Sequence, residues 1–304
     1  MIHNIQAYRV FCYFKTVVGF VVHSGVQTTE SNLNYEESSS VDSLQVRSDG
    51  FIGGKPLTRS NLLSGFHDAV EIGNELKRPV FISENGEKPL IVLHELPGMS
   101  ESFIDYCRRM SDEGFKVYMP LIFKSPGTSM NSAQSLAFCV TKEFRRLFAA
   151  KSMSDSRPFT SWLLHLIQDV ADRHADAKIG VVGMCLTGGF AIAGVADPQV
   201  TAVAACQPSF PFLWNIKSLG FSDADRTQIE AGAANKVLPC VKAYRYSGDW
   251  ICKEAHMKAA KDILGSAMER YTPDLPGKHH STLTSDSASP AVYQDVLKFL
   301  NQRI

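Results

Sequence analysis

A cysteine, an aspartate and a histidine occur in this sequence in an order that suits nucleophilic catalysis. Cys185 lies in the glycine-rich run VVGMCLTGG, Asp249 in AYRYSGDW and His280 in PGKHHSTLT. A cysteine that attacks a carbonyl carbon needs a base to keep it ionised and a carboxylate to orient that base. The three residue types therefore predict acyl transfer to sulfur, in which Cys185 attacks, His280 carries the proton and Asp249 holds the imidazole.

The residues around Cys185 predict a strand, a sharp turn and a helix. The mostly apolar run 179–182 is typical of a buried parallel strand, and the apolar run 190–193 predicts a helix. Cys185 would then lie at the apex of a strained turn between small neighbours, Gly183 and Thr187, near the positive end of a helix dipole that favours its thiolate. On this segment alone, a buried structural cysteine and a phosphate-binding loop stay open as alternatives.

Strands alternate with helices along the rest of the chain. Two strands joined by an Asn-Gly turn of the hairpin type, a helix that begins after Ser100 and ends at Gly114, and a following strand make the first unit. The predicted elements are strands at 79–82, 90–93, 115–119, 179–182, 200–206, 241–246 and 269–272, and helices at 100–114, 131–149, 158–174, 190–193, 253–269 and 290–304. This alternation predicts an α/β fold with a mainly parallel central sheet and helices on both faces.

Ligands of such sheets bind at the carboxyl ends of the strands. Four residues that carry chemistry fall just past predicted strands or in the loops that follow: Glu95, Cys185, Asp249 and His280. The predicted fold therefore places these four residues at the edge of the sheet where a ligand is expected to bind. His94 is expected to support this region by packing rather than by catalysis.

Composition restricts the class of partner. Lys and Arg together number 31, as do Asp and Glu, so the formal net charge is zero and favours neither nucleic acid nor an anionic membrane as partner. The seven cysteines include no CxxC pair, which predicts neither a zinc site nor a disulfide framework. We expect a small-molecule ligand, no metal or organic cofactor, and a reducing, cytoplasmic setting. The sequence is compatible with a homodimer as well as with a monomer.

The N-terminal region needs a separate interpretation. The apolar stretch 8–23 is interrupted by Arg9 and Lys15, which leaves no run long enough to span a membrane. A secretory signal is the alternative, although no convincing cleavage site follows. We expect residues 1–45 to form an N-terminal extension with a polar linker, and residues 46–304 to form the α/β domain.

From about Pro89 to its C-terminus the chain resembles the dienelactone hydrolases, cysteine-dependent members of the α/β-hydrolase superfamily. The resemblance rests on four segments in order: IVLHELPGM, GFKVYMPLIF, GMCLTGG and GD followed by PGKHHS. It implies that the family's nucleophile falls on Cys185, its acid on Asp249 and its histidine on His280 rather than on His279.

The resemblance also implies supporting residues around the nucleophile. The glutamate that restrains the resting cysteine falls on Glu95, for which a plain surface carboxylate is the alternative. The backbone N–H groups of Leu186 and Leu96 would form the oxyanion hole. Trp250, beside the predicted acid, is expected to contact substrate.

Departures from the family pattern affect the expected substrate. Thr187 stands where the family usually has glycine, which we expect to narrow the pocket. The positions of the substrate-carboxylate arginines carry Ser125 and Thr284, and Lys124 next to the first can act only as a point charge. The predicted function is hydrolysis of small carboxylic esters or lactones with altered specificity. The alternative is a catalytically weak hydrolase-fold protein that binds a ligand or partner and carries a redox-sensitive cysteine.

Overall fold

The computed structural model of the protein describes residues 59–73, 75–210 and 218–304. The extension expected over residues 1–45, its apolar stretch and the domain boundary that follows it lie outside the described residues and stay predictions. Within the part that is described, no helix has both the length and the apolar character needed to cross a membrane.

The strands of the described chain form one eight-stranded sheet in the order β1-β2-β4-β3-β5-β6-β7-β8. The β1–β2 and β2–β4 pairs are antiparallel, and every pair from β4–β3 to β7–β8 is parallel. The predicted mainly parallel sheet is therefore confirmed. The strands are β1 Val70–Ile72, β2 Arg78–Ile82, β3 Lys88–Leu93, β4 Phe115–Pro120, β5 Ile179–Met184, β6 Val200–Cys206, β7 Val241–Tyr244 and β8 Met268–Arg270.

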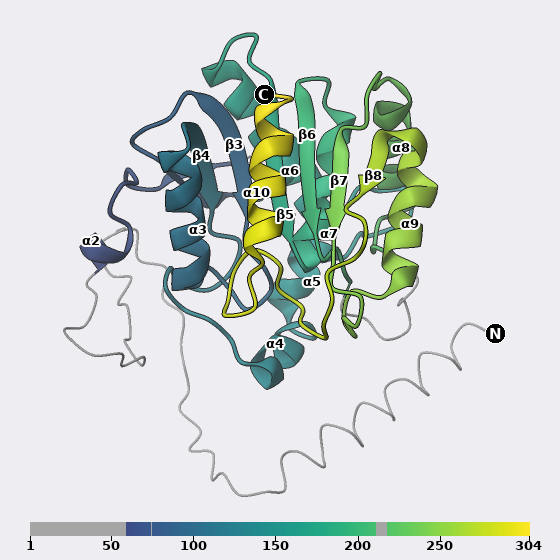
Figure 1. Ribbon diagram of the computed structural model, residues 1–304, viewed down its shortest axis with the longest axis horizontal. Coiled ribbons are helices and arrows are strands. Elements are labelled where there is room, and N and C mark those ends of the chain that lie inside the picture. The colour runs from purple at the N-terminus through teal and green to yellow at the C-terminus, as the bar shows by residue number, and fades with distance from the viewer. Residues whose placement is uncertain (1–58, 74, 211–217) are drawn as a thin grey trace, which may run out of the picture. The chain divides into compact units, whose positions relative to one another are not determined.

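Helices cover both faces of this sheet, with α3 and α10 in front of it and α6 behind it in Figure 1. The side chains of β3 alternate between the two cores, as the two-residue period of a strand requires. Leu90 and Val92 pack in the core that holds α3 and α10, whereas Ile91 and Leu93 pack in the core that holds α5, α6 and α9. The helices are α2 Arg59–Leu62, α3 Glu101–Asp112, α4 Ser132–Phe138, α5 Lys142–Phe148, α6 Pro158–Arg173, α7 Leu186–Ala191, α8 Asp223–Ala234, α9 Glu254–Leu264 and α10 Pro290–Asn301, with 3-10 turns at Ile192–Ala196 and Gly265–Ala267.

The helix predicted after Ser100 is confirmed as α3. The Ser100 hydroxyl accepts a hydrogen bond from the N–H of Phe103 at 3.3 Å, so it caps the helix as the sequence indicates. Gly114 follows the helix with a φ of +92°, a backbone conformation that favours glycine. The helix therefore ends where β4 begins, and the β3-α3-β4 unit is complete.

The predicted hairpin between residues 79–82 and 90–93 is wrong. Both segments are strands, but β4 lies between them, antiparallel to β2 and parallel to β3. The Asn-Gly turn crosses the start of β4: a Cβ on Gly86 would come within 2.1 Å of the Phe115 carbonyl oxygen. The return of the chain through α3 places β4 beside β3, and this long-range pairing overrides the local turn signal.

Two helical regions also differ from expectation. The helix predicted over 131–149 is two helices, because the hydroxyl of Thr141 accepts a hydrogen bond from the Phe144 N–H at 3.1 Å and starts α5 as a new helix. The sequence analysis missed α8, which begins with a capping box between Ser222 and Asp225.

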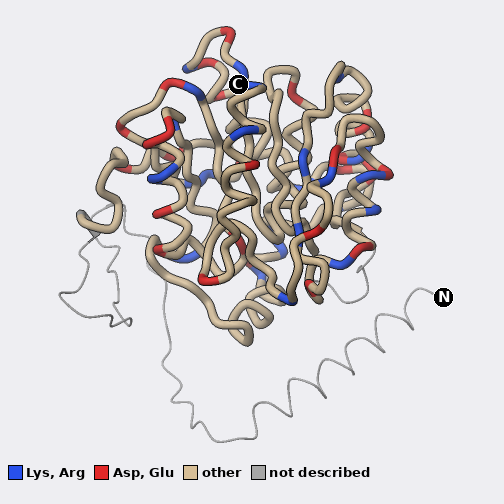
Figure 2. The backbone as a smooth tube through the Cα atoms, viewed as in Figure 1, with Lys and Arg blue, Asp and Glu red and all other residues tan. Residues whose placement is uncertain are grey.

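Charged residues of both signs are interspersed along the described chain (Figure 2). Blue and red segments are scattered over the whole described tube, and neither sign gathers at one end of it. The zero net charge thus reflects mixed charges, not two opposed patches.

Candidate active site

Cys185 lies at the apex of a sharp turn between β5 and α7. Its φ of 57° and ψ of −122° are strained for any residue other than glycine. The turn is tight, since a Cβ on Gly183 would meet the Thr187 carbonyl oxygen at 2.4 Å and one on Gly188 would meet the Cys206 carbonyl oxygen at 2.5 Å. The structure therefore has the strand, turn and helix that the sequence predicts around this cysteine.

Thr187 fits in the turn because its hydroxyl bonds to backbone. The Oγ1 atom accepts a hydrogen bond from the Met184 N–H at 3.1 Å and lies 3.1 Å from the Leu93 carbonyl oxygen. The residue is completely buried, so it cannot line an open pocket. The expected narrowing of a pocket by Thr187 is wrong, since the side chain is used inside the turn.

Asp249 and His280 meet beside this turn. The Nδ1 atom of His280 lies 2.7 Å from Oδ2 of Asp249, and the side chain of Asp249 has no exposed surface. The other carboxylate oxygen of Asp249 accepts hydrogen bonds from the N–H groups of Ile251 at 2.8 Å and Cys252 at 3.0 Å. A carboxylate with these three donors fixes the imidazole with the proton on Nδ1, which leaves Nε2 to exchange a proton.

The electrostatics of His280 couple it to Cys185. Burial alone would lower the pKa of His280, but negative charge on Cys185 and the hydrogen bond to Asp249 raise that pKa well above its usual value. The buried Nε2 atom has no hydrogen-bond partner among the described residues. The Cys185 sulfur lies 3.4 Å from the hydroxyl of Ser209. The electrostatic interaction with Cys185 indicates that the imidazole of His280 lies close to the turn that carries the sulfur.

Glu95 is buried at the end of β3, which argues against the alternative of a plain surface carboxylate. Its Oε1 atom accepts hydrogen bonds from the hydroxyls of Thr284 at 2.6 Å and Ser281 at 3.2 Å. No hydrogen bond joins Glu95 to Cys185 in the part of the chain that the structure describes. Glu95 therefore contacts the loop that carries His280 rather than the cysteine.

The two backbone N–H groups predicted to bind an oxyanion belong to Leu186, directly after Cys185, and to Leu96, in the loop after β3. Leu186 is the first residue of α7, so its N–H has no partner within the helix. Leu96 follows Glu95, and its N–H donates to no other described residue. Both groups are thus free to donate to a ligand.

His94 supports the strand end as expected. Its ring is completely buried, with Nδ1 3.0 Å from the Glu95 carbonyl oxygen and Nε2 accepting from the Ile122 N–H at 3.0 Å. Burial lowers the pKa of His94 to about 4, partly offset by the bond to the Glu95 backbone. The neutral ring thus joins the end of β3 to the loop after β4.

Lys124 lines a cavity of about 480 Å³ between the loop after β4 and helix α4. Cys139, the residue after Phe138 of the cavity lining, interacts electrostatically with Cys185: burial, and to a smaller extent the charge of Cys185, raise the pKa of Cys139 to about 12. Trp250 does not line this cavity and is 74% exposed. The lining residues are Lys124, Ser125, Thr128, Ser129, Met130, Gln134, Ala137, Phe138 and Thr141.

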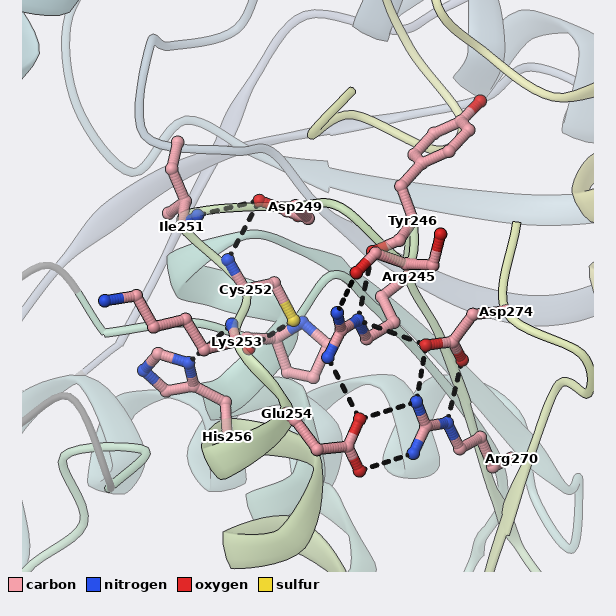
Figure 3. Close-up of polar contacts among 12 residues, drawn as sticks. Arg245, Tyr246, Asp249, Ile251, Cys252, Lys253, Glu254, His256, Arg270 and Asp274 are labelled. Carbon is pink, nitrogen blue, oxygen red and sulfur yellow. Dashed lines mark hydrogen bonds and ion pairs between the residues drawn. The ribbon is translucent and has the colours of Figure 1, made fainter. Parts of the chain in front are cut away.

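An ion-pair network that the sequence analysis missed holds the loop of Asp249 (Figure 3). Arg245 is 5% exposed and donates to the carbonyl oxygens of Tyr246 at 3.0 Å and Ser247 at 2.7 Å. Its guanidinium also pairs with Glu254 and Asp274, both of which Arg270 binds from the other side. The partners lie up to 29 residues from Arg245 in sequence, so no local pattern predicts this network.

Gln207 holds the loop of His280 in a similar way. Its Oε1 atom accepts hydrogen bonds from the backbone N–H of Thr282 at 3.2 Å and from the hydroxyl of Thr282 at 2.6 Å.

Among the described residues, no group of histidine, cysteine and carboxylate side chains is arranged to hold a metal ion.

A mainly parallel sheet with helices on both faces and a strained residue in the turn after a central strand is the α/β-hydrolase fold. Within that fold, the chain belongs to the dienelactone hydrolase family, whose model matches residues 79–231. The protein is therefore a carboxylic ester hydrolase. The match includes Cys185 and Glu95 and ends before Asp249 and His280.

Solved structures share the fold at low sequence identity. A candidate dienelactone hydrolase from Klebsiella pneumoniae is 18% identical, with a TM-score of 0.54 over 78% of this chain and 98% of that one. The esterase Pf2001 from Pyrococcus furiosus is 17% identical, with a TM-score of 0.53 over 82% and 96%. A carboxyl esterase from Bacillus coagulans is 11% identical, with a TM-score of 0.52 over 79% and 99%. A search of curated proteins found no match to this chain.

Proposed function

We propose that this enzyme hydrolyses small carboxylic esters or lactones through Cys185, His280 and Asp249. One observation carries the proposal: Nδ1 of His280 is fixed 2.7 Å from a buried carboxylate of Asp249, and among the described residues its Nε2 atom has no hydrogen-bond partner, while the charge of Cys185 acts on the ring. This arrangement supports a base that takes a proton from the thiol and returns it to a leaving group.

The chemistry proceeds in two halves. The Cys185 thiolate attacks the ester carbonyl carbon, and the N–H groups of Leu186 and Leu96 bind the oxyanion of the tetrahedral intermediate. His280 then protonates the leaving alcohol as the C–O bond breaks and a thioester forms. In the second half His280 takes a proton from water, the hydroxide attacks the thioester, and the acid is released with the Cys185 thiolate.

The roles of Glu95 and Lys124 follow from their contacts. Glu95 accepts hydrogen bonds from the hydroxyls of Ser281 and Thr284, so we assign activation of the thiol to His280 and assign to Glu95 the positioning of the loop that carries His280. Lys124 supplies the only Lys or Arg charge among the residues that line the cavity, which supports a substrate that is neutral or carries a single negative charge.

A cytoplasmic location agrees with the state of the cysteines. The six cysteines in the described part of the chain are all unpaired, as in a reducing compartment.

Hydrolysis of three compounds by wild type and Cys185→Ala tests the proposal. The compounds are p-nitrophenyl acetate, an unsubstituted lactone and a carboxylate-bearing dienelactone. We expect Cys185→Ala and His280→Ala to lose activity, and His279→Ala to keep it, because His279 is an exposed neighbour that contacts only the ring of Tyr246 among the interactions of the described residues. Turnover that does not depend on Cys185 would contradict the proposal, and absence of turnover on all three would favour a ligand-binding or partner-binding protein.

A further inference from the structure

The hydroxyl of Thr187 lies where the turn of Cys185 meets the end of β3. Oγ1 of Thr187 is 3.1 Å from the carbonyl oxygen of Leu93, 3.0 Å from that of His94 and 3.0 Å from that of Met184. It also accepts a hydrogen bond from the Met184 N–H at 3.1 Å. One hydroxyl proton is therefore shared among three acceptors, two of them on β3 or just beyond it.

No backbone hydrogen bond of the described chain provides the same connection. The pairing of β3 with β5 ends at Leu93 and Gly183. Beyond that pair, the backbone of residues 94–96 makes no hydrogen bond to residues 184–187. The Thr187 hydroxyl thus connects the two segments at the point where their strands stop pairing.

These two segments carry the two N–H groups assigned to the oxyanion. Leu186 lies directly before Thr187, and Leu96 lies two residues after His94. Both donors must come within about 2.7–3.1 Å of one oxygen atom to stabilise it. Their separation therefore depends on how the turn is held against the end of β3.

We propose that Thr187 is a positioning residue, which sets the spacing of the Leu186 and Leu96 N–H groups through its hydroxyl. The inference rests on the proposed function, since it concerns the oxyanion of the same reaction. Among the described residues, the hydrogen bonds of the Thr187 hydroxyl all go to backbone atoms, whereas the Cys185 sulfur lies 3.4 Å from the hydroxyl of Ser209. Its loss should weaken stabilisation of the tetrahedral intermediate and leave the ionisation of Cys185 unchanged.

Two reactions of Cys185 separate these effects. Hydrolysis of p-nitrophenyl acetate passes through an oxyanion, whereas iodoacetamide alkylates the thiolate by displacing iodide at a saturated carbon and forms none. Thr187→Val keeps the shape of the side chain and removes the hydroxyl. We expect its kcat for ester hydrolysis to fall about 10- to 100-fold with little change in KM, because removal of a whole oxyanion donor costs about 100- to 1000-fold. The alkylation rate should change less than about twofold, as expected for a hydroxyl whose hydrogen bonds go to backbone and not to the sulfur.

Thr187→Ser is the matched control, because it restores the hydroxyl without the methyl group. We expect it to hydrolyse the ester at close to the wild-type rate. Thr187→Ala replaces the valine variant if the latter does not fold.

Three results would overturn the inference. These are a hydroxyl-free variant with wild-type kcat, a variant whose alkylation slows in parallel with hydrolysis, and a serine variant as defective as valine. A wild-type enzyme without Cys185-dependent hydrolysis would overturn the proposed function itself, so the two failures can be told apart.

Discussion

Mild acid should destabilise this protein through His94. The ring is completely buried, with Nδ1 3.0 Å from the Glu95 carbonyl oxygen and Nε2 accepting from the Ile122 N–H. Protonation of Nε2 would replace that acceptor by a second donor facing an N–H group. Burial accordingly lowers the pKa of His94 to about 4, from an ordinary value of 6.5.

The size of the effect follows from linkage. The unfolded chain binds a proton at His94 below about pH 6.5, and the folded protein does not bind it until about pH 4. The contribution of the neutral ring is thus complete above pH 6.5 and is lost as the pH falls from about 6.5 to about 4. Each pH unit in that range is worth about 1.4 kcal/mol, so the loss reaches about 3 kcal/mol.

Urea denaturation of wild type and His94→Gln at pH 7, 5.5 and 4.5 measures how the free energy of unfolding falls with pH. Glutamine keeps one donor and one acceptor without titrating, so the variant should start less stable at pH 7 and lose less free energy of unfolding as the pH falls. His67→Gln removes an exposed histidine and should leave the wild-type slope unchanged. Equal slopes for wild type and His94→Gln would refute the assignment of acid sensitivity to His94.

Three further substitutions test the site. Asp249→Asn should lower kcat on the order of 10⁴-fold by favouring the wrong imidazole tautomer, with a far-UV spectrum like that of wild type; activity near the wild-type level would exclude Asp249 as the orienting group. Arg245→Met should lower kcat for ester hydrolysis, because it frees the loop before Asp249, whereas Arg270→Gln should affect hydrolysis little, because Arg270 donates only to side chains; equal effects would contradict this difference. Lys124→Met should raise KM about tenfold for a carboxylate-bearing ester and leave KM for p-nitrophenyl acetate unchanged; the same KM change for both would remove Lys124 from substrate binding.

Local patterns predicted the parts of the structure that local forces determine. The turn at Cys185 follows from a short run in which close backbone approach requires glycine, at Gly183 and Gly188. Helix α3 follows from one capping residue and an apolar face. The order of Cys185, Asp249 and His280 also anticipated that the last two meet.

Tertiary contacts decided the features that the sequence analysis missed or mistook. The Asn-Gly turn looked like a hairpin, but β2 pairs with a segment 36 to 40 residues further along the chain, from Ile82 opposite Tyr118 to Val80 opposite Pro120. The sequence analysis expected Thr187 to add bulk to a pocket, because no sequence pattern shows that the carbonyl oxygens of Leu93 and His94 accept a hydrogen bond from its hydroxyl. Arg245 gave no signal at all, because its ion-pair partners come from α9 and from the loop after β8.

Mapping of the acyl-enzyme tests the central claim most directly. The enzyme is mixed with p-nitrophenyl acetate, quenched in acid within the first turnover and digested, and the acetylated peptide is identified by mass spectrometry. Our account predicts acetyl on Cys185, absent from Cys185→Ala. Acetyl on another residue, such as Ser209 with its hydroxyl 3.4 Å from the Cys185 sulfur, would contradict it.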